Sequence, residues 1–147
     1  MKFQEYLAKT KEIATEEKSI LDELSKKDEL TKIEIRAAKS SLQTMIENSI
    51  GKAKKILKYF NCPVVPARSK NAVTFMYDMD LIDDELYQAL IKAIGFRNAM
   101  IHDYMQFNED ILKEIVKDKF NDIIYNFLIE KPNYTEVQLS RVKNFTI

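Results

Sequence analysis

Apolar residues recur every three or four positions along most of the chain, the spacing of amphipathic helices. The clearest stripe starts at Ile35 and ends at Phe60, and it predicts a helix of about seven turns. The chain then reaches Pro63 and Pro66, which should end the helix because proline lacks a backbone donor and disfavours helical angles in the residue before it. The residues between the ends of the stripe that share its apolar face are Ala38, Leu42, Met45, Ser49, Ala53 and Ile56.

Shorter stripes predict one helix before this helix and one after it. The first covers about residues 3–24 and ends in the polar stretch 25–29; its apolar positions are Phe3, Leu7, Ile13, Ile20 and Leu24. A short helix is expected from Ser69 to about Met79, with Ser69 as its N-cap.

A further helix should begin after Asp83, whose side chain is a suitable N-cap. Asp84 and Glu85 would then occupy the first turn, where the helix dipole favours negative charge. The same acidic cluster could suggest a metal site, but no histidine lies nearby and the spacing does not match a calcium loop. We therefore interpret it as capping. The apolar face of this helix comprises Leu86, Leu90, Ala93 and Ile94, and Gly95 lies within the helix or at its end.

The last predicted helix is long, with Asn108 as its N-cap and Pro132 after its end. Its wide apolar face comprises Ile111, Ile115, Phe120, Ile123, Ile124, Phe127 and Leu128. Four main helices joined by short connections, with one additional short helix, predict an all-α, up-and-down bundle. We expect one domain over residues 1–132 and a C-terminal tail of uncertain structure over residues 133–147.

Composition agrees with a single helical domain. The chain has 147 residues, of which 46% are apolar, and it contains only two glycines and three prolines. No run is long and apolar enough to suggest a membrane span or a signal peptide. Cys62 is the single cysteine, so we expect no internal disulfide and no zinc site, and we interpret it as a small buried residue. These features favour a cytoplasmic protein without a metal or other cofactor.

Charge is balanced overall but unevenly distributed. There are 23 basic and 23 acidic side chains. Six basic residues and no carboxylate lie between Glu47 and Asp78, namely Lys52, Lys54, Lys55, Lys58, Arg68 and Lys70. Such a run is usually a solvated helix face. The alternative is a surface that binds a polyanion, with Lys54, Lys55 and Lys58 as candidate RNA-binding residues.

The segment with the most candidate catalytic residues lies near the end of the fourth predicted helix. His102 is the only histidine, and its ordinary pKa is close to neutrality, so it is the first candidate for proton transfer. Alone, a single histidine would indicate little. Its polar neighbours strengthen the case, since five such groups occur within eight positions, Arg97, Asn98, His102, Asp103 and Tyr104.

Arg97 can bind a phosphate through two parallel hydrogen bonds and carries a permanent charge. On one continuous helix, however, His102 points about 140° away from Arg97. Either the helix breaks near His102 or two protomers share the site. A symmetric homodimer would bring two arginines and two histidines together, so that one imidazole acts as base and the other as acid.

The segment Gly95-Phe96-Arg97-Asn98-Ala99-Met100-Ile101-His102-Asp103-Tyr104 resembles the Arg-x4-His-x-Tyr motif of HepT-like toxins in the HEPN superfamily. The preceding residues from Leu81 to Leu86 also resemble the family. The resemblance implies a metal-independent endoribonuclease that cleaves RNA such as tRNA, with Arg97 and His102 as the catalytic pair and Asn98 in support.

The resemblance also implies a type VII-like toxin–antitoxin system. Tyr104 would accept AMP from a cognate minimal nucleotidyltransferase antitoxin. Without the motif, Tyr104 would be interpreted as an amphipathic residue at a helix end. Two other functions remain open at this point: a non-catalytic HEPN subunit that partners a nucleotidyltransferase, and a plain helical interaction protein.

Overall fold

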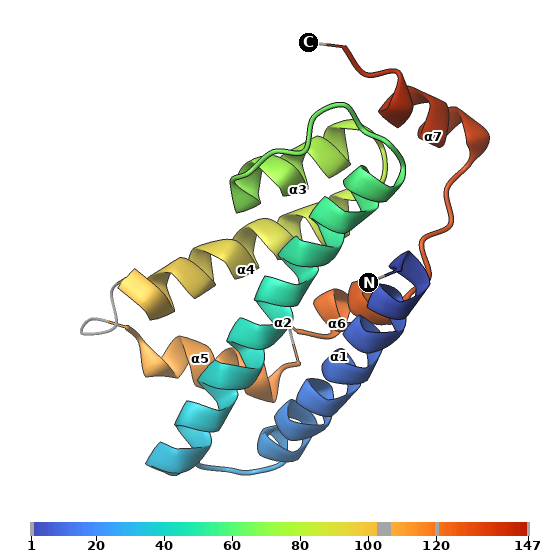
Figure 1. Cartoon of the computed structure of the whole chain (residues 1–147). Helices are drawn as coiled ribbons and strands as arrows, with labels where there is room; N and C mark the ends of the chain where they lie inside the picture. Colours follow the sequence, from blue (N-terminus) through green and yellow to red (C-terminus); the bar gives the residue numbers. More distant parts are fainter. Residues whose placement is uncertain (1, 103–106, 120, 147) are drawn as a thin grey trace.

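The computed structural model describes residues 2–102, 107–119 and 121–146 (Figure 1). This part of the chain contains seven helices. No strand occurs in these ranges, and the predicted all-α class is confirmed. None of the described helices has an apolar stretch long enough to cross a membrane. The helices are α1 (Phe3–Ser25), α2 (Lys32–Tyr59), α3 (Ser69–Asp78), α4 (Asp84–His102), α5 (Glu109–Lys117), α6 (Asp122–Ile129) and α7 (Glu136–Lys143).

Helix α2 lies at the centre of the bundle and packs against α1, α3, α4, α5 and α6 (Figure 1). Its start is set by a capping box in which the Glu34 N–H donates to Thr31 Oγ1 and the Thr31 N–H donates to Glu34 Oε1. The predicted apolar stripe is buried from Ile35 to Ile56, and its last residue, Phe60, is half-buried. After the helix, Cys62 is also buried and its thiol lies 3.0 Å from the Val64 carbonyl oxygen. Helix α2 therefore lies packed beside α4 in the core.

Two of the three predicted N-caps are present. Asp83 Oδ1 accepts the Leu86 N–H at 2.8 Å, and Asn108 Oδ1 accepts the Asp110 N–H at 2.9 Å. The prediction for Ser69 is wrong. Ser69 is the first helical residue of α3, Arg68 occupies the cap position, and no side chain caps the helix. A polar residue that precedes an apolar stripe can be either the N-cap or the first residue of the helix, and the sequence does not distinguish the two.

The predicted long helix after Asn108 is two helices, α5 and α6, and this expectation is corrected. The backbone turns at Lys119, whose φ of 56° lies in the left-handed region. Helix α5 buries Leu112 and Val116, whereas α6 buries Ile124, Phe127 and Leu128. Both segments keep helical spacing, so periodicity alone does not reveal the turn between them. The break lets α6 pack against α1, α2 and α4.

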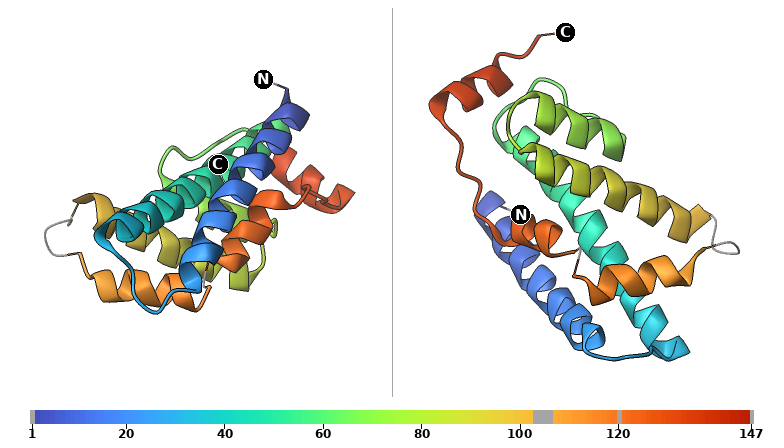
Figure 2. Two further views of the ribbon diagram at one scale, coloured as in Figure 1. Left: turned by 90° about the horizontal axis from the view of Figure 1, so that it is seen from below. Right: turned by 180° about the vertical axis from the view of Figure 1, so that it is seen from behind.

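The predicted tail contains α7, which begins at a capping box formed by Thr135 and Gln138. Figures 1 and 2 show α7 beyond the end of the bundle, connected by an extended segment. Val142 is nevertheless fully buried, and the Gln138 side chain donates to the Asp80 carbonyl oxygen at 2.6 Å. The C-terminal segment is thus attached through α7, while the domain boundary at residue 132 stays a prediction.

Candidate functional site

Helix α4 carries the described candidate catalytic residues and runs without a break from Asp84 to His102. Arg97, Asn98 and His102 therefore share one helix. Of the two arrangements considered from the sequence, a helix break before His102 does not occur. Asp103 and the proposed AMP acceptor Tyr104 lie outside the described residues.

Arg97 is held by two neighbours. Its Nη1 donates to Glu47 Oε1 on α2 at 2.9 Å, and its Nε and Nη2 donate to Asn98 Oδ1 at 3.2 and 3.0 Å. These contacts use three of the five N–H groups of the guanidinium. The Arg97 side chain is 15% exposed. Asn98 thus contacts the Arg97 guanidinium directly, and its supporting role in catalysis stays a prediction.

Sequence reasoning missed Glu47. This carboxylate is the last one before the basic interval, and it belongs to α2, fifty residues from Arg97. Its ion pair with Arg97 connects α2 to α4 at the candidate site. No local pattern could have paired the two residues, because their contact depends on how the helices pack.

The structure does not bring Arg97 and His102 together within one chain. Five residues of helix separate them by about 140° of rotation and about 7.5 Å of rise. His102 is exposed at the end of α4, whereas Arg97 leans toward α2. A single chain therefore presents the two groups in different directions.

Gly95 lies on the same side of α4 as His102, since seven residues make nearly two complete turns. It is exposed, and a Cβ added there would meet no atom within 4 Å. Glycine inside a helix costs about 0.5–1 kcal/mol relative to alanine. Packing among the described residues does not account for this cost. The exposed face also carries Asn98, with the half-buried Ala99 beside it.

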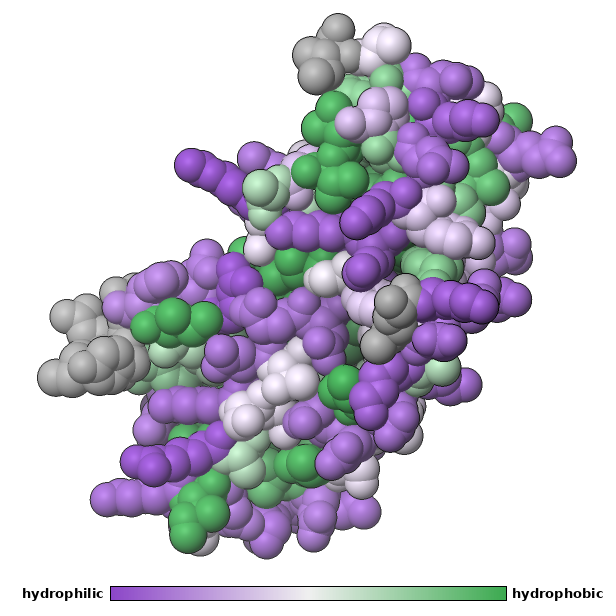
Figure 3. All heavy atoms as spheres, viewed as in Figure 1, coloured by the Kyte–Doolittle hydropathy of each residue, from purple (hydrophilic) through white to green (hydrophobic). Residues whose placement is uncertain are grey.

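An exposed apolar side chain lies close to this face. Ile101, in the last turn of α4, is 42% exposed. Figure 3 shows green, hydrophobic side chains at the left end of the molecule, with purple, hydrophilic side chains around them. Apolar and small residues thus occur together near His102.

The basic interval does not form one continuous surface. Lys52 is buried, and Lys54 Nζ donates to the Ala67 carbonyl oxygen at 2.5 Å, which attaches the loop after α2. Lys55 Nζ lies 5.4 Å from the centre of the Tyr6 ring, and Lys58 is exposed. Lys58 lies eleven residues beyond Glu47, about 16 Å along the helix. Lys55 and Lys58 are thus available at the surface, whereas Lys54 is partly engaged.

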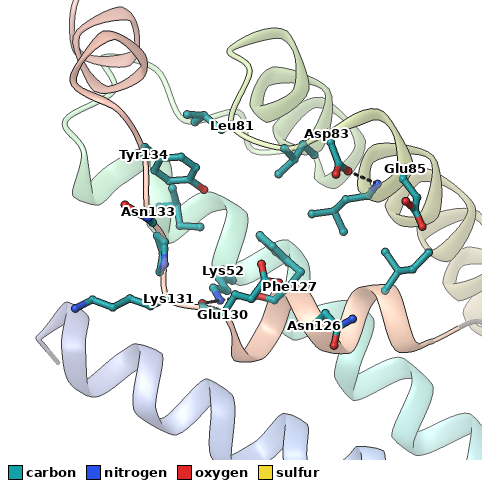
Figure 4. A pocket seen from close by; sticks show the side chains of 15 residues that line it. Lys52, Leu81, Asp83, Glu85, Asn126, Phe127, Glu130, Lys131, Asn133 and Tyr134 are labelled. Carbon is teal, nitrogen blue, oxygen red and sulfur yellow. Dashed lines mark hydrogen bonds between the residues drawn. The ribbon is translucent and has the colours of Figure 1, made fainter.

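A polar pocket of about 420 Å³ surrounds Lys52, at the opposite end of α4 from Arg97 (Figure 4). Lys52 Nζ donates to the carbonyl oxygens of Phe127 and Glu130 at the end of α6. Burial lowers the pKa of Lys52 to about 8, partly offset by the Glu130 carboxylate. Burial also raises the pKa of Tyr134, on the pocket wall, to about 12, with a smaller contribution from Glu130. Among the described residues, no cluster of histidine, cysteine or carboxylate side chains is placed to hold a metal ion.

Comparison with protein families gives one match that covers most of the chain. A family model described as "Ribonuclease HepT-like" matches residues 3–128. A curated protein named "mRNA nuclease HepT", from Shewanella oneidensis, is 33% identical over 58 residues. That match covers 40% of this chain and 44% of the relative, so the similarity spans less than half of either protein.

Two solved structures share the fold. One is the tri-AMPylated HEPN toxin of Shewanella oneidensis in complex with an MNT antitoxin, with a TM-score of 0.75 and 20% identity. The comparison covers 87% of this chain and 96% of that one. The other, a toxin–antitoxin with AMP-PNP, has a TM-score of 0.73 and 19% identity, over 87% of this chain and 99% of that one.

Proposed function

Because the chain belongs to the HepT-like ribonuclease family, we propose that it is an endoribonuclease toxin that uses Arg97 and His102 to cleave RNA. The proposed reaction needs no metal ion, since the RNA supplies its own nucleophile. The 2′-hydroxyl attacks the adjacent phosphorus, and the bond to the 5′-oxygen of the next nucleotide breaks. One imidazole removes the proton of the 2′-hydroxyl, and another protonates the leaving 5′-oxygen. Arg97 stabilises the negative charge that develops on the phosphate.

The catalytic site is proposed to be shared by two chains. The observation behind this is that α4 is unbroken, which separates Arg97 from His102 within each chain. In a symmetric homodimer, the two α4 helices would face each other and complete a shared site. The exposed Gly95 supports this arrangement, since a residue without a side chain allows a partner helix to approach closely. The exposed Ile101 supplies apolar surface that a partner would bury.

We therefore expect the free protein to sediment as a dimer, at twice the chain mass of 17.2 kDa. Gly95→Leu should shift the protein to monomer and reduce cleavage, while its helical circular dichroism remains. Glu16→Leu, which adds the same side chain at an exposed position of α1, should leave the dimer intact. A wild-type protein that sediments only as a monomer at micromolar concentration would contradict the shared site.

The RNA path is proposed to continue from Arg97 along α2 to Lys55 and Lys58, with Lys54 making a weaker contribution. Phosphate contacts of this kind position RNA without specifying its sequence. A structured or single-stranded RNA such as tRNA, in the cytoplasm, is the proposed substrate.

The proposed partner is a minimal nucleotidyltransferase that silences the toxin by transferring AMP to Tyr104. The two structural relatives are toxin–antitoxin complexes, one of them tri-AMPylated, which supports a search for this modification. Tyr104 follows His102 by two residues, so an added nucleotide would place negative charge and bulk beside the catalytic groups.

Tyr104→Phe tests the acceptor directly, because it removes the hydroxyl and keeps the ring. Co-expressed with the cognate nucleotidyltransferase, this variant should carry at least one AMP fewer than wild type in intact-mass measurements and should stay toxic. Peptide mapping of the wild-type protein should place the missing AMP at residue 104. Equal AMP incorporation by the two proteins would assign the modification to other residues.

A further inference from the structure

The Arg97 guanidinium is held by residues of two different helices. On α4 itself, Asn98 Oδ1 accepts hydrogen bonds from Nε and Nη2. On α2, Glu47 Oε1 accepts from Nη1 at 2.9 Å. A guanidinium is planar and its five N–H donors point in fixed directions, so contacts at all three nitrogens restrain both its position and its plane. Glu47 adds the restraint that Asn98 cannot supply, because it attaches the guanidinium to a second helix.

These contacts leave two N–H groups of Arg97 for a ligand. With the described residues, Nη1 and Nη2 each donate one hydrogen bond, and each nitrogen carries a second hydrogen. The remaining donors are therefore shared between the two terminal nitrogens. Arginine commonly binds a phosphate through two parallel hydrogen bonds from two nitrogens. A phosphate can thus bind Arg97 without displacing Glu47.

The end of α4 that carries Arg97 has few other attachments. The buried residues of this helix are Leu90 and Ile94, so its last two turns contain none. On α2, by contrast, Glu47 directly follows Ile46, which is buried in the core. Within the described ranges, the contact between Glu47 and Arg97 is the one side-chain hydrogen bond between α2 and α4. Glu47 therefore connects the candidate catalytic end of α4 to the central helix.

This ion pair is better suited to orientation than to stability. The Arg97 side chain is 15% exposed, but the Glu47 side chain is 45% exposed. An ion pair with a solvated partner contributes little to the free energy of folding, because water screens the attraction. The direction of the guanidinium, however, decides how its N–H groups meet a reacting phosphate, and catalysis is sensitive to such placement.

We propose that Glu47 is a positioning residue for RNA cleavage, which holds the Arg97 guanidinium so that its two remaining N–H groups face the oxygens of the cut phosphate. The proposal rests on the ribonuclease activity proposed above. Glu47 exchanges no proton with the RNA and acts only through Arg97. Its role therefore differs from that of the two imidazoles, which transfer protons.

The first test measures steady-state cleavage of a defined RNA. Glu47→Ala should lower kcat by about 10²-fold with little change in KM, because a misplacement of about 1 Å near the reacting groups costs this much. Glu47→Gln should recover most of the rate, since its amide oxygen can still accept from Nη1. In an Arg97→Ala background, Glu47→Ala should have no further effect.

Asp122→Ala is the matched control. Asp122 Oδ1 lies 2.9 Å from Lys18 Nζ in an ion pair that joins α1 to α6, with side chains that are 48% and 13% exposed. This variant loses a contact of the same length and exposure between helices that carry no candidate catalytic residue, so it should cleave RNA like wild type. An equal loss of rate in Asp122→Ala and Glu47→Ala would leave Glu47 a structural role only and overturn the proposal.

Two other kinetic results would also overturn it. If Glu47→Gln were as slow as Glu47→Ala, the reaction would require the charge or the proton of the carboxylate rather than its hydrogen bond. If Glu47→Ala bound RNA more tightly and cleaved it at the wild-type rate, Glu47 would compete with the phosphate for Arg97.

The second test requires no cleavage. In protein labelled with ¹⁵N-arginine, Arg97→Lys identifies the signals of Arg97 among those of the four arginines. A held guanidinium gives separate Nη1 and Nη2 signals, whereas rotation about the Nε–Cζ bond averages them. The two signals should be separate in wild type, Glu47→Gln and Asp122→Ala, and averaged in Glu47→Ala.

Separate signals in Glu47→Ala would show that Asn98 alone holds Arg97, and averaged signals in wild type would show that Arg97 is not held. Either result would overturn the proposal. A wild-type protein that cleaves no RNA would refute the ribonuclease, while the NMR signals would still decide whether Glu47 holds Arg97.

Discussion

Replacing His102 by alanine is expected to lower the rate of RNA cleavage by about 10²–10⁴-fold, the usual contribution of general acid–base catalysis. No other histidine in the chain can replace it. Because His102 is exposed at the end of α4, its removal should cost little stability. Single-turnover cleavage of a defined RNA, together with circular dichroism and sedimentation, measures both effects. Full cleavage by a folded His102→Ala dimer would refute the proposed mechanism.

The effect of replacing Arg97 can be compared with the effect of replacing His102. Arg97→Ala should reduce cleavage by about 10²–10³-fold, by analogy with the loss of one donor to a developing oxyanion. Arg97→Lys keeps the charge but cannot make two parallel hydrogen bonds, so it should restore only part of the activity. A rate equal to wild type in Arg97→Lys would show that charge alone is required there.

Replacing Lys52 by methionine is expected to have the largest effect on stability. Lys52 is 1% exposed, and its ammonium caps the end of α6 through the carbonyls of Phe127 and Glu130. Methionine fills similar space but donates no hydrogen bond, so both carbonyls lose a partner. Each unpaired buried carbonyl costs about 1–3 kcal/mol, so the free energy of unfolding should fall by about 2–6 kcal/mol at pH 7.

This loss should grow as the pH rises. Burial lowers the pKa of Lys52 to about 8, below its ordinary value near 10.5. Below pH 8, Lys52 is charged in both the folded and the unfolded chain. Between pH 8 and 10.5 the unfolded chain holds a proton that the folded chain has released, so rising pH favours folding. Wild type should therefore gain about 2 kcal/mol between pH 8 and 10 that Lys52→Met does not gain.

Urea unfolding of both proteins at pH 7, 8.5 and 10 gives the comparison. The raised pKa values of Tyr6 and Tyr134 affect both proteins alike, so their contributions cancel in the difference. Lys55→Met, on the surface of the same helix, should follow wild type at every pH. Parallel stability curves for wild type and Lys52→Met would refute the assigned proton linkage.

The helical content and the central helix could be predicted from the sequence. The stripe of α2 and the caps at Asp83 and Asn108 depend on residues within a few positions of one another, so local reasoning reaches them. Whether the helix continues from Arg97 to His102 stayed open from the sequence, and the structure shows that it does. The left-handed turn at Lys119 could not be predicted, because lysine gives no local signal for positive φ.

The sequence alone determined the fold class and the candidate catalytic pair, because helical periodicity and a short motif are properties of neighbouring residues. Only the tertiary structure decided that Arg97 pairs with Glu47 and that Lys52 caps α6. Each of these features joins or faces helices distant along the chain. Their contacts depend on how the helices pack around α2, which no pattern within a single helix encodes.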